Sequence, residues 1–199
     1  MGACCSCCED ASAAVSETEM KEQKATNIKS LSISRVMSAP SVDVQDDCKM
    51  SGYGLGLVGV AVEQDAAYWE AHIQHDPGMS QEVSFGVATK KDQQFYRSME
   101  EQDSADAKGT SLMRSIKVKD GDVVGIAVQQ SDLPMVQFLL NGEPLHDLAV
   151  NRFRGAVYPA IYLPENDGLT VRFVFRESEF EKLSPHARFG PLIVARGII

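Results

Sequence analysis

Hydrophobic and polar residues alternate along this chain in short blocks that predict β-strands, and the clearest block spans residues 121–142. Two apolar runs, VVGIAV and MVQFLL, are joined there by the polar stretch QQSDLP. The second run ends at Asn141 and Gly142, a pair that tolerates the positive φ angles of a tight type I′ turn. The block therefore predicts a β-hairpin followed by a further chain reversal.

Four more runs rich in strand-forming residues are bounded by Gly, Pro, Asn or Asp: 68–74, 83–90, 154–163 and 169–175. In the first run Trp69, Ala71 and Ile73 share one face, which we assign to the core, because alternate residues of a strand point to opposite sides. Short strands joined by turns, without a helical period between residues 121 and 175, predict an all-β antiparallel sandwich.

Size and charge narrow the classes of function. The chain has 199 residues and a formal net charge of −9, with a sequence pI of about 4.9. This acidic balance argues against a nucleic-acid partner, because binding phosphate requires a basic face. Composition divides the chain into a flexible N-terminal tether, residues 1–50, which is rich in Ser, Ala, Glu, Lys and Thr, and a folded domain, residues 51–199. The apolar runs fall far short of the roughly 20 residues that span a bilayer as a helix.

The first residues carry a pattern for lipid attachment. The sequence begins MGACCS, which fits the N-myristoylation pattern with Gly2 as the acceptor and Ser6 at the hydroxyl position. One myristoyl chain binds a membrane only weakly, so stable anchoring requires a second signal. S-palmitoylation of the neighbouring cysteines would supply that signal: Cys4, Cys5, Cys7 and Cys8. This pattern predicts a cytoplasmic protein that is peripherally anchored to a membrane by lipid.

The same four cysteines leave open an alternative, a metal-binding or redox function. Structural zinc sites usually draw two pairs of ligands from separated segments, and no second pair of Cys or His follows in this sequence. We therefore assign no metal and no cofactor to the chain.

Ser38 is a candidate phosphorylation site in the predicted tether. Arg35 lies three residues before it and Pro40 two residues after it. A phosphate on Ser38 beside this arginine would suit an adaptor that reads phosphoserine, so we treat this motif as a second, regulatory hypothesis.

The glycines at 54–59 match the G-x-G-x-x-G fingerprint of dinucleotide-binding enzymes. That fingerprint works only between a buried strand and a helix whose N-terminus receives the pyrophosphate. Here a polar stretch precedes it and another β-like run, Val60-Ala61-Val62, follows it. The four histidines are scattered, and no serine lies in a G-x-S-x-G elbow. We therefore expect a glycine-rich entry into a sheet, and a protein that is not an enzyme.

Five short motifs occur in an order that resembles the SPRY domain family. They are an aromatic-glutamate strand, a glycine-valine-alanine strand, a Gly-Asp strand ending in glycine, a strand ending in Asn-Gly, and a Tyr-Pro-Ala strand. In this chain they are Tyr68-Trp69-Glu70, Ser84-Phe85-Gly86-Val87-Ala88, Gly121-Asp122-Val123-Val124-Gly125, Phe138-Leu139-Leu140-Asn141-Gly142 and Val157-Tyr158-Pro159-Ala160. Together they cover most of residues 52–175.

The resemblance implies a bent antiparallel β-sandwich, a jelly roll like that of concanavalin, which binds a protein partner through its loops and has no catalytic activity. It implies a lone SPRY domain that acts as a monomeric adaptor. The chain departs from the family between residues 89 and 121, where a usual hairpin is replaced by a polar segment. If the binding groove of the family is kept, its anchors here are Phe95, Tyr96 and Arg97, since aromatic residues and arginine are typical of interfaces. Packing of Phe95 and Tyr96 on the sheet edge is the alternative.

Overall fold

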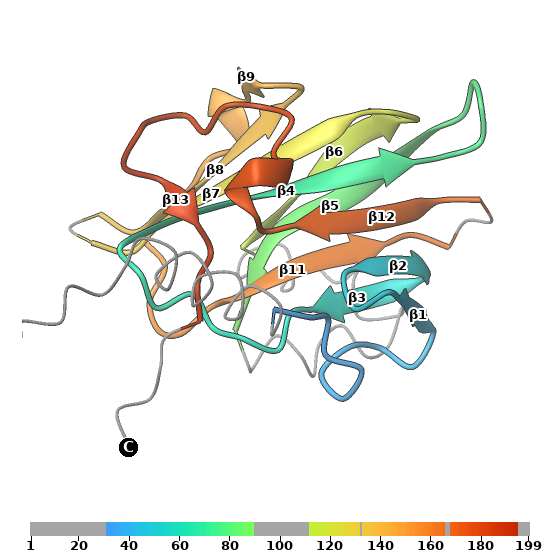
Figure 1. The fold of residues 1–199 in the computed structure, drawn as a ribbon, viewed down its shortest axis with the longest axis horizontal. Coiled ribbons are helices and arrows are strands. Elements are labelled where there is room, and N and C mark those ends of the chain that lie inside the picture. The colour runs from blue at the N-terminus through green and yellow to red at the C-terminus, as the bar shows by residue number, and fades with distance from the viewer. Residues whose placement is uncertain (1–30, 90–111, 132, 166–167, 195–199) are drawn as a thin grey trace, which may run out of the picture.

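Two β-sheets form the fold in the computed structural model, which describes residues 31–89, 112–131, 133–165 and 168–194 (Figure 1). The larger sheet is antiparallel in strand order β1-β2-β12-β4-β7-β8-β10, and the smaller one has the order β3-β11-β5-β6. The strands of the larger sheet are β1 (Val42–Gln45), β2 (Lys49–Gly52), β12 (Thr170–Val174), β4 (Ala66–Gln74), β7 (Val123–Gln129), β8 (Met135–Leu140) and β10 (Val150–Asn151). Two further short strands join this sheet. β9 (Glu143–Pro144) pairs with β8, and β13 (Gly190–Pro191) pairs in parallel with β4. Those of the smaller sheet are β3 (Gly54–Leu57), β11 (Tyr158–Leu163), β5 (Ser80–Ala88) and β6 (Met113–Lys119).

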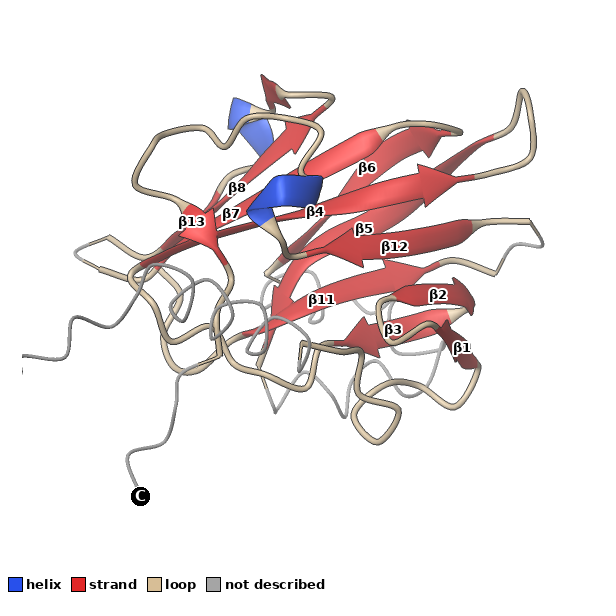
Figure 2. Ribbon diagram, viewed as in Figure 1, coloured by secondary structure: helices blue, strands red, loops and turns tan. Residues whose placement is uncertain are grey.

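The core lies between the two sheets, whose strands overlie one another in Figure 2. Trp69, Ala71 and Ile73 of β4 are buried there, as their alternation in the sequence predicts. Phe85 and Val87 of β5 pack into the same cluster from the smaller sheet. The expected all-β antiparallel sandwich is therefore confirmed. The only helices in the described residues are two 3₁₀ turns, η2 (His146–Leu148) and η3 (Glu177–Glu179), and none of the described helices has the length and apolarity to cross a membrane.

The predicted hairpin within residues 121–142 is formed by β7 and β8, with Val124 opposite Leu140. Asn141 and Gly142 have φ angles of 54° and 90°, which suit the tight turn that leads into β9. The Asn141 side chain also accepts a hydrogen bond from the Val123 backbone N–H at 2.9 Å and donates one to Asp122 at 3.0 Å. The Asn141 side chain therefore connects the end of β8 to the start of β7 by hydrogen bonds.

The folded domain begins well before residue 51, so the predicted tether is wrong for residues 31–50. Leu31 and Ile33 are 1% and 4% exposed and belong to the main core. The segment that they begin also covers the free edge of β3, because the N–H of Ser34 donates to Leu57 O at 2.7 Å. Strands β1 and β2 then add the outer edge of the larger sheet. The first thirty residues lie outside the described part of the chain.

The glycine-rich stretch 54–59 contains strand β3, which pairs with β11 and leads into no helix. A dinucleotide site is contradicted here, because the pyrophosphate would have no helix N-terminus to bind. Packing explains Gly56, since a Cβ at that position would lie 2.8 Å from Met50 Sδ. Gly125 on β7 is similar, because a Cβ there would lie 2.6 Å from the Tyr68 hydroxyl.

The C-terminal segment, residues 177–194, packs on the outer face of the larger sheet, as the red trace in front of β4 and β7 in Figure 1 shows. Phe180 meets the ring of Tyr68 edge-on, with centroids 5.1 Å apart. Tyr68 forms a second buried cluster there with Ala127, Leu139 and Phe189. Strand β4 is therefore buried on both faces, although its sequence alternation assigns only one face to the core.

Candidate functional site: a charged groove on the larger sheet

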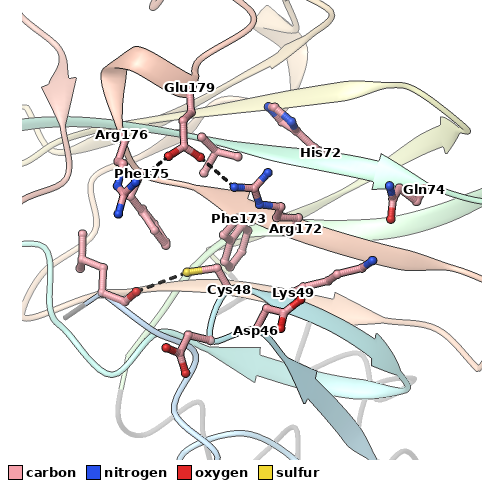
Figure 3. A pocket seen from close by; sticks show the side chains of 13 residues that line it. Asp46, Cys48, Lys49, His72, Gln74, Arg172, Phe173, Phe175, Arg176 and Glu179 are labelled. Atoms are coloured by element: carbon pink, nitrogen blue, oxygen red, sulfur yellow. Dashed lines mark hydrogen bonds and ion pairs between the residues drawn. The ribbon is translucent and has the colours of Figure 1, made fainter. Parts of the chain in front are cut away.

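A groove of about 580 Å³ opens on the face of the larger sheet that points away from the main core (Figure 3). Strands β2, β12 and β4 contribute to it, together with the β1–β2 turn and η3. We call it the outer groove, and its polar lining residues are Asp46, Asp47, Cys48, Lys49, His72, Gln74, Arg172, Arg176 and Glu179.

The strand register places three basic residues in one row across the outer groove. Arg172 on β12 is the Cα partner of Lys49 on β2 and of His72 on β4. Residues directly opposite one another on neighbouring antiparallel strands point to the same face. Met50 on β2 and Phe173 on β12, the residues that follow Lys49 and Arg172, point instead into the core. The row is therefore a product of strand pairing between three distant segments.

Glu179 supplies a carboxylate to this basic surface from η3. Its Oε2 accepts a hydrogen bond from Arg172 Nη2 at 2.7 Å, and its Oε1 accepts one from Arg176 Nη1 at 3.0 Å. The arginine side chains are 54% and 42% exposed. Exposed ion pairs of this kind contribute little stability, because water screens the charges in either arrangement. The two arginines can therefore exchange this partner for another anion at small cost.

Beneath the end of the row lies Glu70, a carboxylate with no exposed surface. It accepts hydrogen bonds from Tyr68 Oη at 3.1 Å and from the backbone N–H groups of Glu181 and Lys182 at 2.9 and 2.8 Å. His72 Nε2 lies 2.7 Å from its Oε2. Burial alone would raise the pKa of Glu70, but these hydrogen bonds together outweigh burial and hold the pKa below its ordinary value. Burial, followed by the charge of Glu70, raises the pKa of Tyr68. Glu70 thus remains charged and fixes His72 at the rim.

Cys48 is half-buried at the base of the groove and is not suited to nucleophilic chemistry. Its Sγ donates a hydrogen bond to Leu31 O at 3.3 Å. Burial, and then the nearby charge of Asp47, raise the pKa of the Cys48 thiol to about 11. A thiol with so high a pKa is neutral near pH 7, whereas nucleophiles and metal ligands are thiolates. Within residues 31–89, 112–131, 133–165 and 168–194, no group of three His, Cys, Asp or Glu side chains could hold a metal ion.

Most of the site residues predicted from the sequence fall outside the part of the chain that the structure describes. These are the lipidation residues and the proposed partner anchors: Gly2, Cys4, Cys5, Cys7, Cys8, Phe95, Tyr96 and Arg97. They stay predictions.

Ser38 lies within the described residues, and its burial contradicts the proposed phosphorylation. It is 5% exposed, and its Oγ accepts a hydrogen bond from the Leu57 backbone N–H at 3.0 Å. A kinase would have to open the edge of β3 to reach this hydroxyl. Arg35 is also engaged elsewhere, because its Nη2 donates to the Val44 carbonyl. Ser38 is a structural residue of the folded domain.

The outer groove could not be predicted from the sequence, although one pattern indicated part of its lining. The alternation in residues 169–176 puts Arg172 and Arg176 on the polar face of their strand. Lys49, however, falls within the stretch assigned to the tether, so nothing in the pattern places it opposite Arg172. Glu179 belongs to a short turn that periodicity does not detect.

Comparison with known proteins supplies a fold and no family. No protein-family model matches the chain, and no curated protein matches it. Among solved structures, the NHR1 domain of Drosophila melanogaster Neuralized is similar, with 8% identity, 72% of this chain and 97% of that chain covered, and a TM-score of 0.50. The fold is an antiparallel β-sandwich similar to that of this NHR1 domain.

Two SPRY domain structures are also similar to the chain. The SPRY domain of human HERC1 has 16% identity and a TM-score of 0.48, over 71% of this chain and 96% of that one. A further human SPRY domain has 14% identity and a TM-score of 0.44, over 67% and 94%. From the motifs GDVVGI and RGAVYPAIY we expect a particular likeness to SPRY domain-containing protein 7, and the comparisons do not support this expectation.

Proposed function

We propose that this protein is a non-catalytic protein-interaction module, a SPRY-like domain held at a cytoplasmic membrane surface by acylation of its N-terminus. The observation that carries the interaction is the outer groove. It is an open surface lined by arginine, lysine, histidine and acidic side chains, and its one thiol is neutral. Such a surface suits recognition of another protein's side chains better than enclosure of a substrate.

The membrane tether rests on the N-terminal sequence alone. Gly2 would carry a myristoyl chain, and the cysteines would carry palmitoyl chains: Cys4, Cys5, Cys7 and Cys8. The interaction domain would then be presented close to the membrane, where its partner is also expected.

Fractionation of cells tests the tether. We expect the wild-type chain to sediment with membranes and to show the added mass of its acyl chains, and Gly2→Ala to be soluble and unmodified. Ser6→Thr is the matched control, because it keeps the hydroxyl that the pattern requires and should remain on the membrane. If wild type and Gly2→Ala are both soluble and unmodified, the lipid anchor is wrong.

Site-specific photo-crosslinking in cells tests the interaction. A benzophenone amino acid is placed in turn at four exposed positions around the domain: Gln74, Met79, Leu133 and Leu183. We expect a discrete adduct of higher mass from at least one position, and mass spectrometry then identifies the partner. Absence of an adduct from all four positions in a correctly folded chain would show that the domain is not an interaction module.

A further inference from the structure

The row of basic residues in the outer groove, Lys49, Arg172 and His72, lowers the stability of the sheet. Lys49 and Arg172 are directly opposite each other on β2 and β12. Side chains in such pairs lie with their Cβ atoms about 5 Å apart, and like charges there repel and destabilise the sheet. His72 extends the row on the other side of Arg172. A neutral residue at position 49 would relieve the repulsion, so this charge points to a bound anion.

Only part of the row is neutralised within the described chain. Glu179 binds Arg172 and Arg176, and His72 lies against Glu70 and at 3.5 Å from Glu181. Lys49 makes no ion pair with any residue among those that the structure describes. Lys49 therefore lines a groove of about 580 Å³ without a carboxylate of the described chain within ion-pair distance of its ammonium group.

Glu179 shows which chemistry this surface accepts. A carboxylate seated between two guanidinium groups receives one hydrogen bond from each, at 2.7 and 3.0 Å. The side chain is 33% exposed and reaches the arginines from a short turn, so it holds them weakly. A carboxylate from another protein could make the same contacts and add one to Lys49.

Two acidic residues of the β1–β2 turn limit how much negative charge can enter the groove. Asp46 and Asp47 form the β1–β2 turn with φ angles of 46° and 59°, and both line the groove. Their carboxylates add negative charge to the lining, which disfavours a run of acidic residues more than a single one. Charge complementarity thus favours one Asp or Glu flanked by residues without negative charge.

We propose that the outer groove binds an acidic side chain of a partner protein, whose carboxylate pairs with Arg172 and Lys49 in place of the internal Glu179. This inference rests on the proposed interaction function and specifies the chemistry of the partner. The groove then recognises a carboxylate by charge-assisted hydrogen bonds, and Glu179 competes with the partner for the arginines.

Selection of displayed random peptides against the full-length chain tests the inference. We expect the selected peptides to share an Asp or Glu at one position. Replacement of that residue by Asn or Gln should weaken binding about tenfold or more, as the loss of a charge-assisted hydrogen bond does. Arg172→Gln and Lys49→Gln should weaken binding to a similar extent. Glu179→Gln should strengthen it severalfold, because it frees both arginines.

Lys117→Gln is the matched control, since Lys117 is an exposed strand lysine on the smaller sheet. It should leave peptide affinity unchanged. Three outcomes would each overturn the inference. The selected peptides could share no acidic residue, the selection could yield no peptide at all, or Arg172→Gln and Lys49→Gln could both leave binding intact. So would Arg172-dependent binding to phosphatidylserine vesicles without peptide binding, because the groove would then face the membrane. Lys49→Gln keeps the test decisive if Arg172→Gln does not fold. If the groove does not bind a carboxylate but the interaction function is right, the photo-crosslinking experiment should still yield adducts.

Discussion

Glu70 is the residue on which the outer layer of the molecule depends. A buried carboxylate is costly unless its oxygens are fully hydrogen-bonded, and here four groups approach it within 3.1 Å. Two of them are the backbone N–H groups of Glu181 and Lys182, which join the C-terminal segment to β4. The carboxylate therefore holds this segment on the sheet and fixes His72 at the rim of the outer groove.

Replacement of Glu70 by Gln should lower the free energy of unfolding at pH 7 by about 1–3 kcal/mol, because an amide –NH₂ would face donors in place of an oxygen. Chemical denaturation measures this change. Glu82→Gln is the matched control, since Glu82 is an exposed strand residue that accepts only a long hydrogen bond, 3.4 Å, from the Ser115 hydroxyl and lies opposite Lys117 on β6. Glu82→Gln should leave stability almost unchanged.

The lowered pKa of Glu70 gives this prediction a pH dependence. The folded-state pKa lies below the ordinary value of 4.5, so the stabilisation is complete above that pH and is lost as the pH falls through the folded-state pKa. The difference in stability between wild type and Glu70→Gln should therefore shrink on acidification. Stability curves that stay parallel down to acid unfolding would contradict the assigned charge.

The β1–β2 hairpin extends the larger sheet and brings Lys49 beside Arg172. Two aspartates form its turn at positive φ, where glycine or asparagine is usual, and each such residue stores strain of about 1 kcal/mol. The hairpin thus combines a strained turn with a repulsive cross-strand pair. Both features are unfavourable for folding, and both lie at the outer groove.

Lys49→Gln should raise the free energy of unfolding by about 0.5 kcal/mol at low salt, because it removes the cross-strand repulsion. The gain should disappear at high salt, where the charges are screened. Denaturant titration at two salt concentrations measures it, and Lys117→Gln serves again as the control. A loss of stability in Lys49→Gln would mean that Lys49 has a stabilising partner, and the like-charge argument for the groove would fall.

The folded unit as a whole includes the segment that starts at Leu31. Leu31, Ile33 and Met50 contribute buried side chains to the core, and β1 and β2 contribute one edge of the larger sheet. Removal of a single large core side chain costs about 2–5 kcal/mol, against a total stability of about 5–15 kcal/mol for a domain. Loss of the whole segment should therefore exceed what the domain can tolerate.

We expect a chain that begins at Leu31 to unfold cooperatively on heating, and a chain that begins at Ser51 to lack a cooperative transition. Circular dichroism and amide chemical-shift dispersion distinguish the two. The comparison is matched, because the two chains differ only by residues 31–50. If the shorter chain melts at the same temperature as the longer one, the original boundary at residue 51 would be right after all.

Local pattern was sufficient to derive the strands and the sandwich from the amino-acid sequence. Alternation in β4, the apolar runs of β7 and β8, and the turn at Asn141 and Gly142 each depend on residues within one element, where periodicity is a direct consequence of strand geometry. The same reasoning argued against a dinucleotide site, and in the structure strand β3 runs through these glycines and leads into no helix. Strands β1, β2 and β6 were missed, as were the two-residue strands β9, β10 and β13. β1 and β2 have four residues each, which are too few to stand out from a polar composition. β6 lies within residues 89–121, which the sequence reasoning treated as a polar segment, and the structure instead pairs it with β5.

The tertiary fold alone decided which faces are covered and which side chains meet. Glu70 is buried because a segment more than a hundred residues later packs on it, and no local pattern carries that information. Ser38 is buried for a similar reason, at the edge of β3. Lys49, His72 and Arg172 are far apart in the sequence, and they form one row only because β2, β4 and β12 pair in a particular register. Pairing between distant strands is a property of the whole chain, so the outer groove follows from the fold and from no single stretch of sequence.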